Sequence, residues 1–420
     1  MTSIGEPKVN LEVDTVSATL REISWPDLFP WQIMFRTLRT ALGVQLLLVA
    51  TVGAIAGSIV WRLSERLFVR ADVANQPTVV AYDIQLLRSW PGASGGAVLP
   101  DVIRHFELPL PESQYAPVDP HVSVPYRFVV PLRRLLDRNV SWGHWGYYAC
   151  GWLGQLAVWG LFGGTIARLA TLELGREERG SLAAAFSHGR RHWWYHIGTP
   201  LSCLLPVVIL GGMLAMLGII MNAGAGMFLA GVVWPVVLLV SAFVAVFLIG
   251  LLFGFPLMIP SVAAESSDSY EALSRSFSYV YQRPLHYLFY ATVASVIGLV
   301  GWCMVWFAAE MVIATALGAT LWATGENQSA TLLSLVGESS GVITSPPLLF
   351  RGGAALIRAF DGLVRAIASG FAYSFFFTAS SAIYLLLRYH VDAVELDEVS
   401  DPDQPSTFGL SSLALKSEQE

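Results

Sequence analysis

The sequence predicts an all-α fold: a six-span transmembrane helical bundle with two parallel-repeat hairpins, short interfacial amphipathic helices and a long irregular outer loop. Of the 420 residues, 54% are apolar and only 13% are charged, about half the charged share of a typical soluble domain. The apolar residues come in long runs rather than in the periods of soluble helices. The 14 Trp and 14 Tyr suit the aromatic belts at a membrane surface.

Six segments are long and apolar enough to cross a membrane, because a spanning helix needs about 20 such residues. A cytoplasmic N-terminal segment, 1–39, precedes the first span at 40–61, and a Pro-rich outer loop follows at 62–144. The membrane repeat region, 145–318, supplies four spans, over 145–167, 198–221, 228–255 and 287–318. An outer loop and interfacial helix fill 319–365. The last span is 366–390, and an acidic cytoplasmic tail covers 391–420.

The longest uncharged stretch, 197–264, contains no ionisable Asp, Glu, Lys, Arg or His. As one helix it would be roughly 100 Å long, far more than one crossing needs. The sequence NAGAG at 222–226 permits a tight reversal there. Pro256 and Pro260 are expected to kink or stop the second helix of this hairpin.

Arginine positions predict the orientation. Five of the 25 basic residues fall in the connection 168–196, and Arg275 and Arg283 lie in the connection 265–286. By the positive-inside rule these connections and both termini are cytoplasmic, in a bacterial inner membrane. The nine Arg of 62–139 oppose this assignment, but long loops count less in the rule.

A short amphipathic element occurs twice, at 181–195 and at 269–287. Ser181 and Ser269 are the expected N-caps, while Glu265 and Asp268 are also placed to cap the second helix. Each element follows a span that enters the cytoplasm and precedes one that leaves it. The two hairpins are therefore predicted to be a parallel repeat.

A third amphipathic segment, 351–365, carries Arg every seven residues and is expected to lie along the outer membrane surface before the last span. Arginines in such elements suit phosphate headgroups. The candidates for lipid-headgroup contact are Arg190, Arg191, Arg275, Arg283, Arg358 and Arg365.

Two further sets of polar residues are candidates for chemistry. Glu310 is the one acid well inside an apolar run, and acids in such places often serve as proton or cation sites. His188, His192 and His196 would share a face if one helix ran through them, as metal ligands do. Gly189 and the Trp193–Trp194 pair predict instead that the helix ends there, which favours interfacial histidines.

The composition and motifs exclude several classes. Only Lys8 and Lys416 are lysines and the net charge is −6, so no nucleic-acid partner is expected. The three cysteines stand apart inside apolar runs and predict neither disulfides nor a metal site. Nucleotide-binding, hydrolase and zinc-protease motifs are missing from the sequence, so no cofactor, metal or catalytic residue is expected.

Several stretches resemble a known group of membrane proteins. They are EALSRSF at 271–277, QRPLHYLFY at 282–290, IARLATLELGREERGSLAAAF at 166–186 and AIYLLLRYHVDAVELDEV at 382–399. Together they resemble the polytopic membrane domain that accompanies some bacterial glycerophosphodiester phosphodiesterases, and planctomycete-like inner-membrane relatives that lack the enzyme. The resemblance covers about 140–400. It implies a multi-pass membrane protein and transfers no catalytic residue.

The sequence leaves three functional classes open. The first is a non-catalytic multi-pass protein of envelope organisation or lipid contact, with membrane lipid and a homo-oligomer or another membrane protein as partners. The second is a transporter or channel subunit that uses Glu310. The third is a membrane-embedded lipid-modifying enzyme, which would need a polar cluster at the inner boundary.

Overall fold

The computed structural model describes residues 30–68, 120–135, 140–222, 224–325 and 347–399, with a few positions between 328 and 335. Within these ranges the chain forms helices and no strand, which confirms the all-α prediction. A 3-10 turn, η1 (Pro30–Gln32), precedes ten α-helices. These are α2 (Ile33–Ala41), α3 (Val44–Phe68), α6 (Pro120–Leu135), α7 (Trp142–Gly175), α8 (Leu182–Arg191), α9 (Trp193–Ile220), α10 (Gly224–Glu265), α11 (Ser269–Gln282), α12 (Pro284–Trp322) and α14 (Leu348–Asp392).

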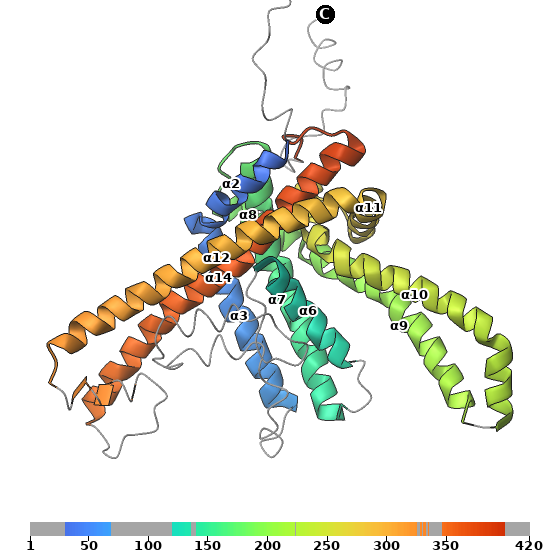
Figure 1. Cartoon of the computed structure of the whole chain (residues 1–420), viewed down its shortest axis with the longest axis horizontal. Coiled ribbons are helices and arrows are strands. Elements are labelled where there is room, and N and C mark those ends of the chain that lie inside the picture. Colours follow the sequence, from blue (N-terminus) through green and yellow to red (C-terminus); the bar gives the residue numbers. More distant parts are fainter. Residues whose placement is uncertain are drawn as a thin grey trace, which may run out of the picture.

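The helices form three arms that converge at one end (Figure 1). Helices α3, α6 and α7 make the central arm, the α9–α10 hairpin extends to one side, and α12 with α14 extends to the other. The short helices α2, α8 and α11 lie at the converging end. The N-terminal ends of α3, α9 and α12 therefore all lie at this same end of the molecule.

Five helices are long and apolar enough to cross a membrane: α3, α9, α10, α12 and α14. The molecule therefore has the fold of a helical membrane protein. The predicted span 145–167 lies in α7, which is not one of the five. Its sequence carries many glycines, and Gln155 and Arg168 are buried in it. Other helices surround α7, so it does not need a lipid-facing apolar surface.

The core lies between α7 and the second half of α14. In the most apolar 18-residue stretch of α14, 94% of the residues are buried inside the protein. The ring of Trp159 on α7 stacks on Tyr373 of α14, with 4.1 Å between centroids. A side chain at Gly163 would lie 2.6 Å from the ring of Phe377, so the missing Cβ lets the two helices approach closely.

The α9–α10 hairpin confirms the predicted reversal but not the effect of the prolines. Helix α9 ends at Ile220 and α10 begins at Gly224. Helix α10 continues through Pro256 and Pro260 to Glu265, so neither proline stops the helix, which was one of the two expected effects. A proline removes one backbone hydrogen bond. Here the residues from 254 to 264 are buried without interruption, and this packing holds the helical path.

The irregular outer loop predicted for 62–144 is wrong in two places. Helix α3 continues to Phe68, and residues 120–135 form α6 with Pro125 and Pro131 inside it. Phe128 is buried, and its carbonyl accepts a hydrogen bond from Trp152 Nε1 at 2.9 Å. Proline content predicted a loop, whereas tertiary contacts with α7 and α14 hold a helix. The remaining loop residues, 69–119, lie outside the described part of the chain.

The separate interfacial helix predicted at 351–365 is also wrong. This segment is the first part of the 45-residue helix α14 and continues into the last span. Its apolar side chains at Leu356 and Phe360 are exposed, while Arg365 turns toward α12. The amphipathic pattern that predicted a surface helix thus reflects two faces of α14. One face exposes apolar side chains, and the other carries Arg365 against α12.

Both short amphipathic elements form, as α8 and α11, at the same end of the molecule (Figure 1). Ser181 caps α8 as predicted, by accepting from the Ala184 amide at 3.2 Å. For α11 the cap is Asp268, which accepts from the Glu271 amide at 2.8 Å, and Ser269 is the first helical residue instead. The parallel repeat itself stays a prediction.

The start of the predicted acidic tail folds back onto α7. After Ala393, which has a left-handed conformation (φ 54°), Arg176 Nε donates to the carbonyl of Asp397 at 3.2 Å. Val399 is buried. The residues that follow, 400–420, lie outside the described part.

Candidate functional site

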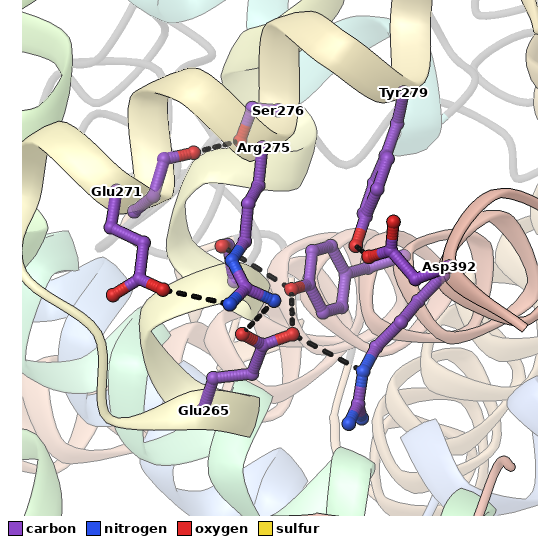
Figure 2. Close-up of polar contacts among 10 residues, drawn as sticks. Glu265, Glu271, Arg275, Ser276, Tyr279 and Asp392 are labelled. Atoms are coloured by element: carbon purple, nitrogen blue, oxygen red, sulfur yellow. Dashed lines mark hydrogen bonds and ion pairs between the residues drawn. The ribbon is translucent and has the colours of Figure 1, made fainter. Parts of the chain in front are cut away.

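A cluster of charged side chains lies where α10, α11 and α14 meet. Two rows with i, i+4, i+8 spacing create it, because such residues share one face of a helix. Helix α11 carries Glu271, Arg275 and Tyr279 in one row. Helix α14 carries the other row, Tyr384, Arg388 and Asp392. Glu265, the last residue of α10, lies between the two (Figure 2). We call these seven residues the junction cluster.

Glu265 is the centre of the junction cluster. Its carboxylate forms ion pairs with Arg275 Nη1 and, at 3.2 Å, with Arg388 Nε. It also accepts a hydrogen bond from the Tyr384 hydroxyl at 2.6 Å. The side chains of Glu265 and Arg388 are only 11% and 9% exposed. The two positive charges and the hydroxyl together compensate the cost of burying this carboxylate.

Two more contacts extend the junction cluster toward water. Arg275 Nη2 donates to Glu271 at 2.7 Å, and the Tyr279 hydroxyl donates to Asp392 (Figure 2). Burial raises the pKa of Tyr279 above its usual value, and the bond to Asp392 raises it further. Burial alone would lower the pKa of Arg275, but the hydrogen bond to Glu271 and the charge of Glu265 outweigh it and raise that pKa. Tyr279 therefore keeps its proton and Arg275 keeps its charge, as their contacts require.

The junction cluster acts as a clamp, because its ion pairs and hydrogen bonds join helices that are distant in the sequence. Its carboxylates are occupied by arginines and tyrosines, and it joins α10 and α14, which belong to two different arms, with the short helix α11. Arg388 Nη1 is buried without a hydrogen-bond partner. Among the described residues, no group of three or more His, Cys, Asp or Glu side chains is placed to hold a metal ion. The enzyme alternative requires a polar cluster, and in this one the carboxylates of Glu265, Glu271 and Asp392 are engaged by arginine or tyrosine side chains.

The three histidines come together around α7 without sharing one helix. Helix α8 ends at Arg191 and α9 begins at Trp193, so the predicted break is confirmed. His188 Nε2 lies 3.1 Å from Ser266 Oγ, and the rings of His188 and His192 stack at 4.2 Å. His196 is buried against Gly164, and neither of its ring nitrogens has a hydrogen-bond partner.

The electrostatics keep His188 neutral. Burial is the main cause that lowers its pKa from 6.5 to about 2, and the nearby charge of Arg168 lowers it further. Arg168 itself is buried and donates to the carbonyl of Ala263 at 3.0 Å. The neutral imidazole thus belongs to the packing between α7, α8 and the end of α10.

Glu310 lies in the arm made by α12 and α14, where Arg365 neutralises it. Arg365 Nε and Nη2 donate to the two carboxylate oxygens at 2.8 and 3.2 Å. Such a two-pronged contact is the strongest form of this ion pair. The Glu310 side chain is 14% exposed and the Arg365 side chain is 17% exposed. The structure thus unites two residues that the sequence assigned to different roles.

The six arginines predicted to contact lipid headgroups fall into two groups. Arg190, Arg191 and Arg283 are exposed at the converging end of the arms, and Arg358 is partly exposed on α14. Arg275 and Arg365 instead form ion pairs with carboxylates of the protein. Sequence reasoning missed Glu265 as the centre of a cluster and expected only a cap. The two i, i+4, i+8 rows of charged and tyrosine residues were the signal that could have revealed it.

No family model, curated protein or solved structure matches the chain. The resemblance to the membrane domain that accompanies glycerophosphodiester phosphodiesterases therefore stays a prediction.

Proposed function

We propose that the protein is a non-catalytic membrane scaffold of the bacterial cytoplasmic membrane, whose apolar arms contact lipid and neighbouring membrane proteins. The observation that carries the proposal is the exposure of the α9–α10 hairpin. Of the most apolar 18-residue stretches, only 11% in α9 and 6% in α10 is buried. Apolar surface of this extent is stable only in lipid or against another apolar surface.

The polar sites support a structural rather than a chemical role. The junction cluster fastens α10, α11 and α14 at one end, and Arg365 with Glu310 fastens α12 to α14 within an arm. The transporter alternative requires Glu310 to be released from Arg365 during its cycle. The enzyme alternative requires a free nucleophile or base near the junction cluster, and its described carboxylates are all paired.

The first test asks whether the arms lie in the acyl region. Single cysteines at the exposed positions Met216 and Leu239, in a chain whose native cysteines are replaced, would carry an environment-sensitive fluorophore in vesicles. We expect stronger quenching by lipids with a doxyl group in the acyl chain than by headgroup quenchers. Ala183→Cys on α8 is the matched exposed control and is expected to show the reverse. Equal quenching at all three positions would refute the proposal.

A second test addresses transport. Proteoliposomes with the wild-type chain are expected to show no more proton or cation flux than vesicles with Glu310→Gln. Flux that depends on Glu310 would replace the scaffold proposal with the transporter alternative.

A further inference from the structure

The apolar arms begin next to exposed arginines at the converging end. Arg39 lies in the last turn of α2 just before α3, Arg190 and Arg191 end α8 just before α9, and Arg283 lies between α11 and α12. All four side chains are exposed. We call Arg39, Arg190, Arg191 and Arg283 the arginine collar. Each arm thus starts with at least one positive charge at the same end of the molecule (Figure 1).

Exposed large apolar side chains come within a few residues of these charges in the chain. They are Val44 after Arg39 (81% exposed), Trp194 after Arg191 (71% exposed) and Leu285 after Arg283 (78% exposed). At a membrane surface this arrangement is favourable, because the apolar side chain enters the acyl region while the guanidinium reaches the phosphate level.

An exposed ion pair, as is typical of a water-facing surface, lies at the same end. Arg36 on α2 pairs with Glu177 after α7 at 2.6 Å, and both side chains are largely exposed. No such carboxylate engages the collar: no ion pair or hydrogen bond joins the side chain of Arg39, Arg190, Arg191 or Arg283 to any described residue. Four unpaired guanidinium groups therefore remain available to an external anion.

We infer that the arginine collar binds the phosphate groups of anionic lipids at the membrane surface. This inference rests on the proposed function, because it takes the arms to lie in lipid. A lipid surface fits better than a protein partner, since the same charge-plus-apolar pairing recurs on three separate arms. A single protein would contact one continuous face, whereas a bilayer contacts the start of every arm at once.

The test compares two variants that lose the same charge. The collar variant is Arg39→Gln/Arg190→Gln/Arg191→Gln/Arg283→Gln. The control variant, Arg66→Gln/Arg133→Gln/Arg134→Gln/Arg351→Gln, removes four exposed arginines away from the converging end. Full-length protein in mild detergent would be titrated with short-chain phosphatidylglycerol or phosphatidylcholine, with bound lipid counted by native mass spectrometry.

We expect the wild type and the control variant to prefer phosphatidylglycerol, and the preference to weaken with added salt. The collar variant is expected to lose roughly fivefold in affinity per arginine, on the order of several hundredfold in all. The four Arg→Lys substitutions keep the charge and are expected to keep the preference. A wild type without preference, or equal losses in collar and control variants, would overturn the inference. Either result, with acyl-chain quenching of the arms intact, leaves the scaffold proposal standing.

Discussion

Replacing Glu265 by Gln should destabilise the chain far more than the same change at Glu271. Both acids pair with Arg275, but the Glu265 side chain is 11% exposed and the Glu271 side chain is 48% exposed. Gln at 265 keeps the size and can still accept from Tyr384, yet it leaves buried Arg388 without a counter-charge. Breaking a buried ion pair from one side costs about 3–5 kcal/mol, and the retained hydrogen bond places this case near 3.

The Glu271→Gln substitution removes only a partly exposed i, i+4 pair within α11. Such pairs contribute about 0.3–0.5 kcal/mol, so the loss of stability in Glu265→Gln should be roughly six to ten times that in Glu271→Gln. The free energy of unfolding would be measured by titration with sodium dodecyl sulfate into mixed micelles. Amide hydrogen exchange in α11 would show whether the loss begins at the junction cluster.

A double substitution separates charge from packing. Glu265→Gln/Arg388→Met removes the uncompensated guanidinium, and is expected to recover part of the loss, because apolar replacement of a buried pair is often close to neutral. Equal losses in Glu265→Gln and Glu271→Gln would show that burial does not set the strength of this cluster, and the clamp interpretation would fail.

Three further outcomes follow from single contacts. Gly164→Ala should lose about 1–3 kcal/mol of stability in the same titration, because its Cβ would meet the ring of His196, while Gly211→Ala, with open space around it, should lose nothing. Tyr279→Phe should lose about 1.5–3 kcal/mol by deleting the hydrogen bond to the Asp392 carboxylate, and a loss equal to that of Tyr281→Phe, whose hydroxyl donates to the Val246 carbonyl, would contradict a special role of the charge. The pKa of His188 is about 2 in the folded chain against 6.5 normally. Below about pH 6.5 only the unfolded chain therefore binds this proton. The free energy of unfolding should fall with decreasing pH, by up to about 1.4 kcal/mol per pH unit. His188→Gln should flatten that slope in titrations from neutral pH to about pH 5, and an unchanged slope would contradict the assignment.

Periodicity and length predicted much of the fold because the apolar runs are long. The reversal at 222–226, the spans of α3, α9, α10, α12 and α14, and the two short helices α8 and α11 all follow from local patterns. The prediction was wrong where prolines or charges dominated the local signal. Helix α6 contains Pro125 and Pro131, and contacts with α7 and α14 outweigh their local preference.

The candidate sites show the same division. Arg190, Arg191 and Arg283 are exposed at helix ends, and their place at a membrane surface stays a prediction. Arg365 pairs with a carboxylate on another helix, and Arg275 pairs with Glu265 at the end of α10 in addition to Glu271 of its own helix. Glu310 is 55 residues from Arg365, and no local period relates the two.

The amino-acid sequence by itself determined that this chain is helical, that it is built for an apolar environment, and where most helices begin and end. These properties depend on hydrophobicity and hydrogen bonding within short segments. Only the tertiary structure decided that α14 is the core helix, that the α9–α10 hairpin is exposed, and that Glu265 joins three helices. Those features depend on which faces of distant segments meet, and side-chain pairing across the fold has no periodic signature in the chain.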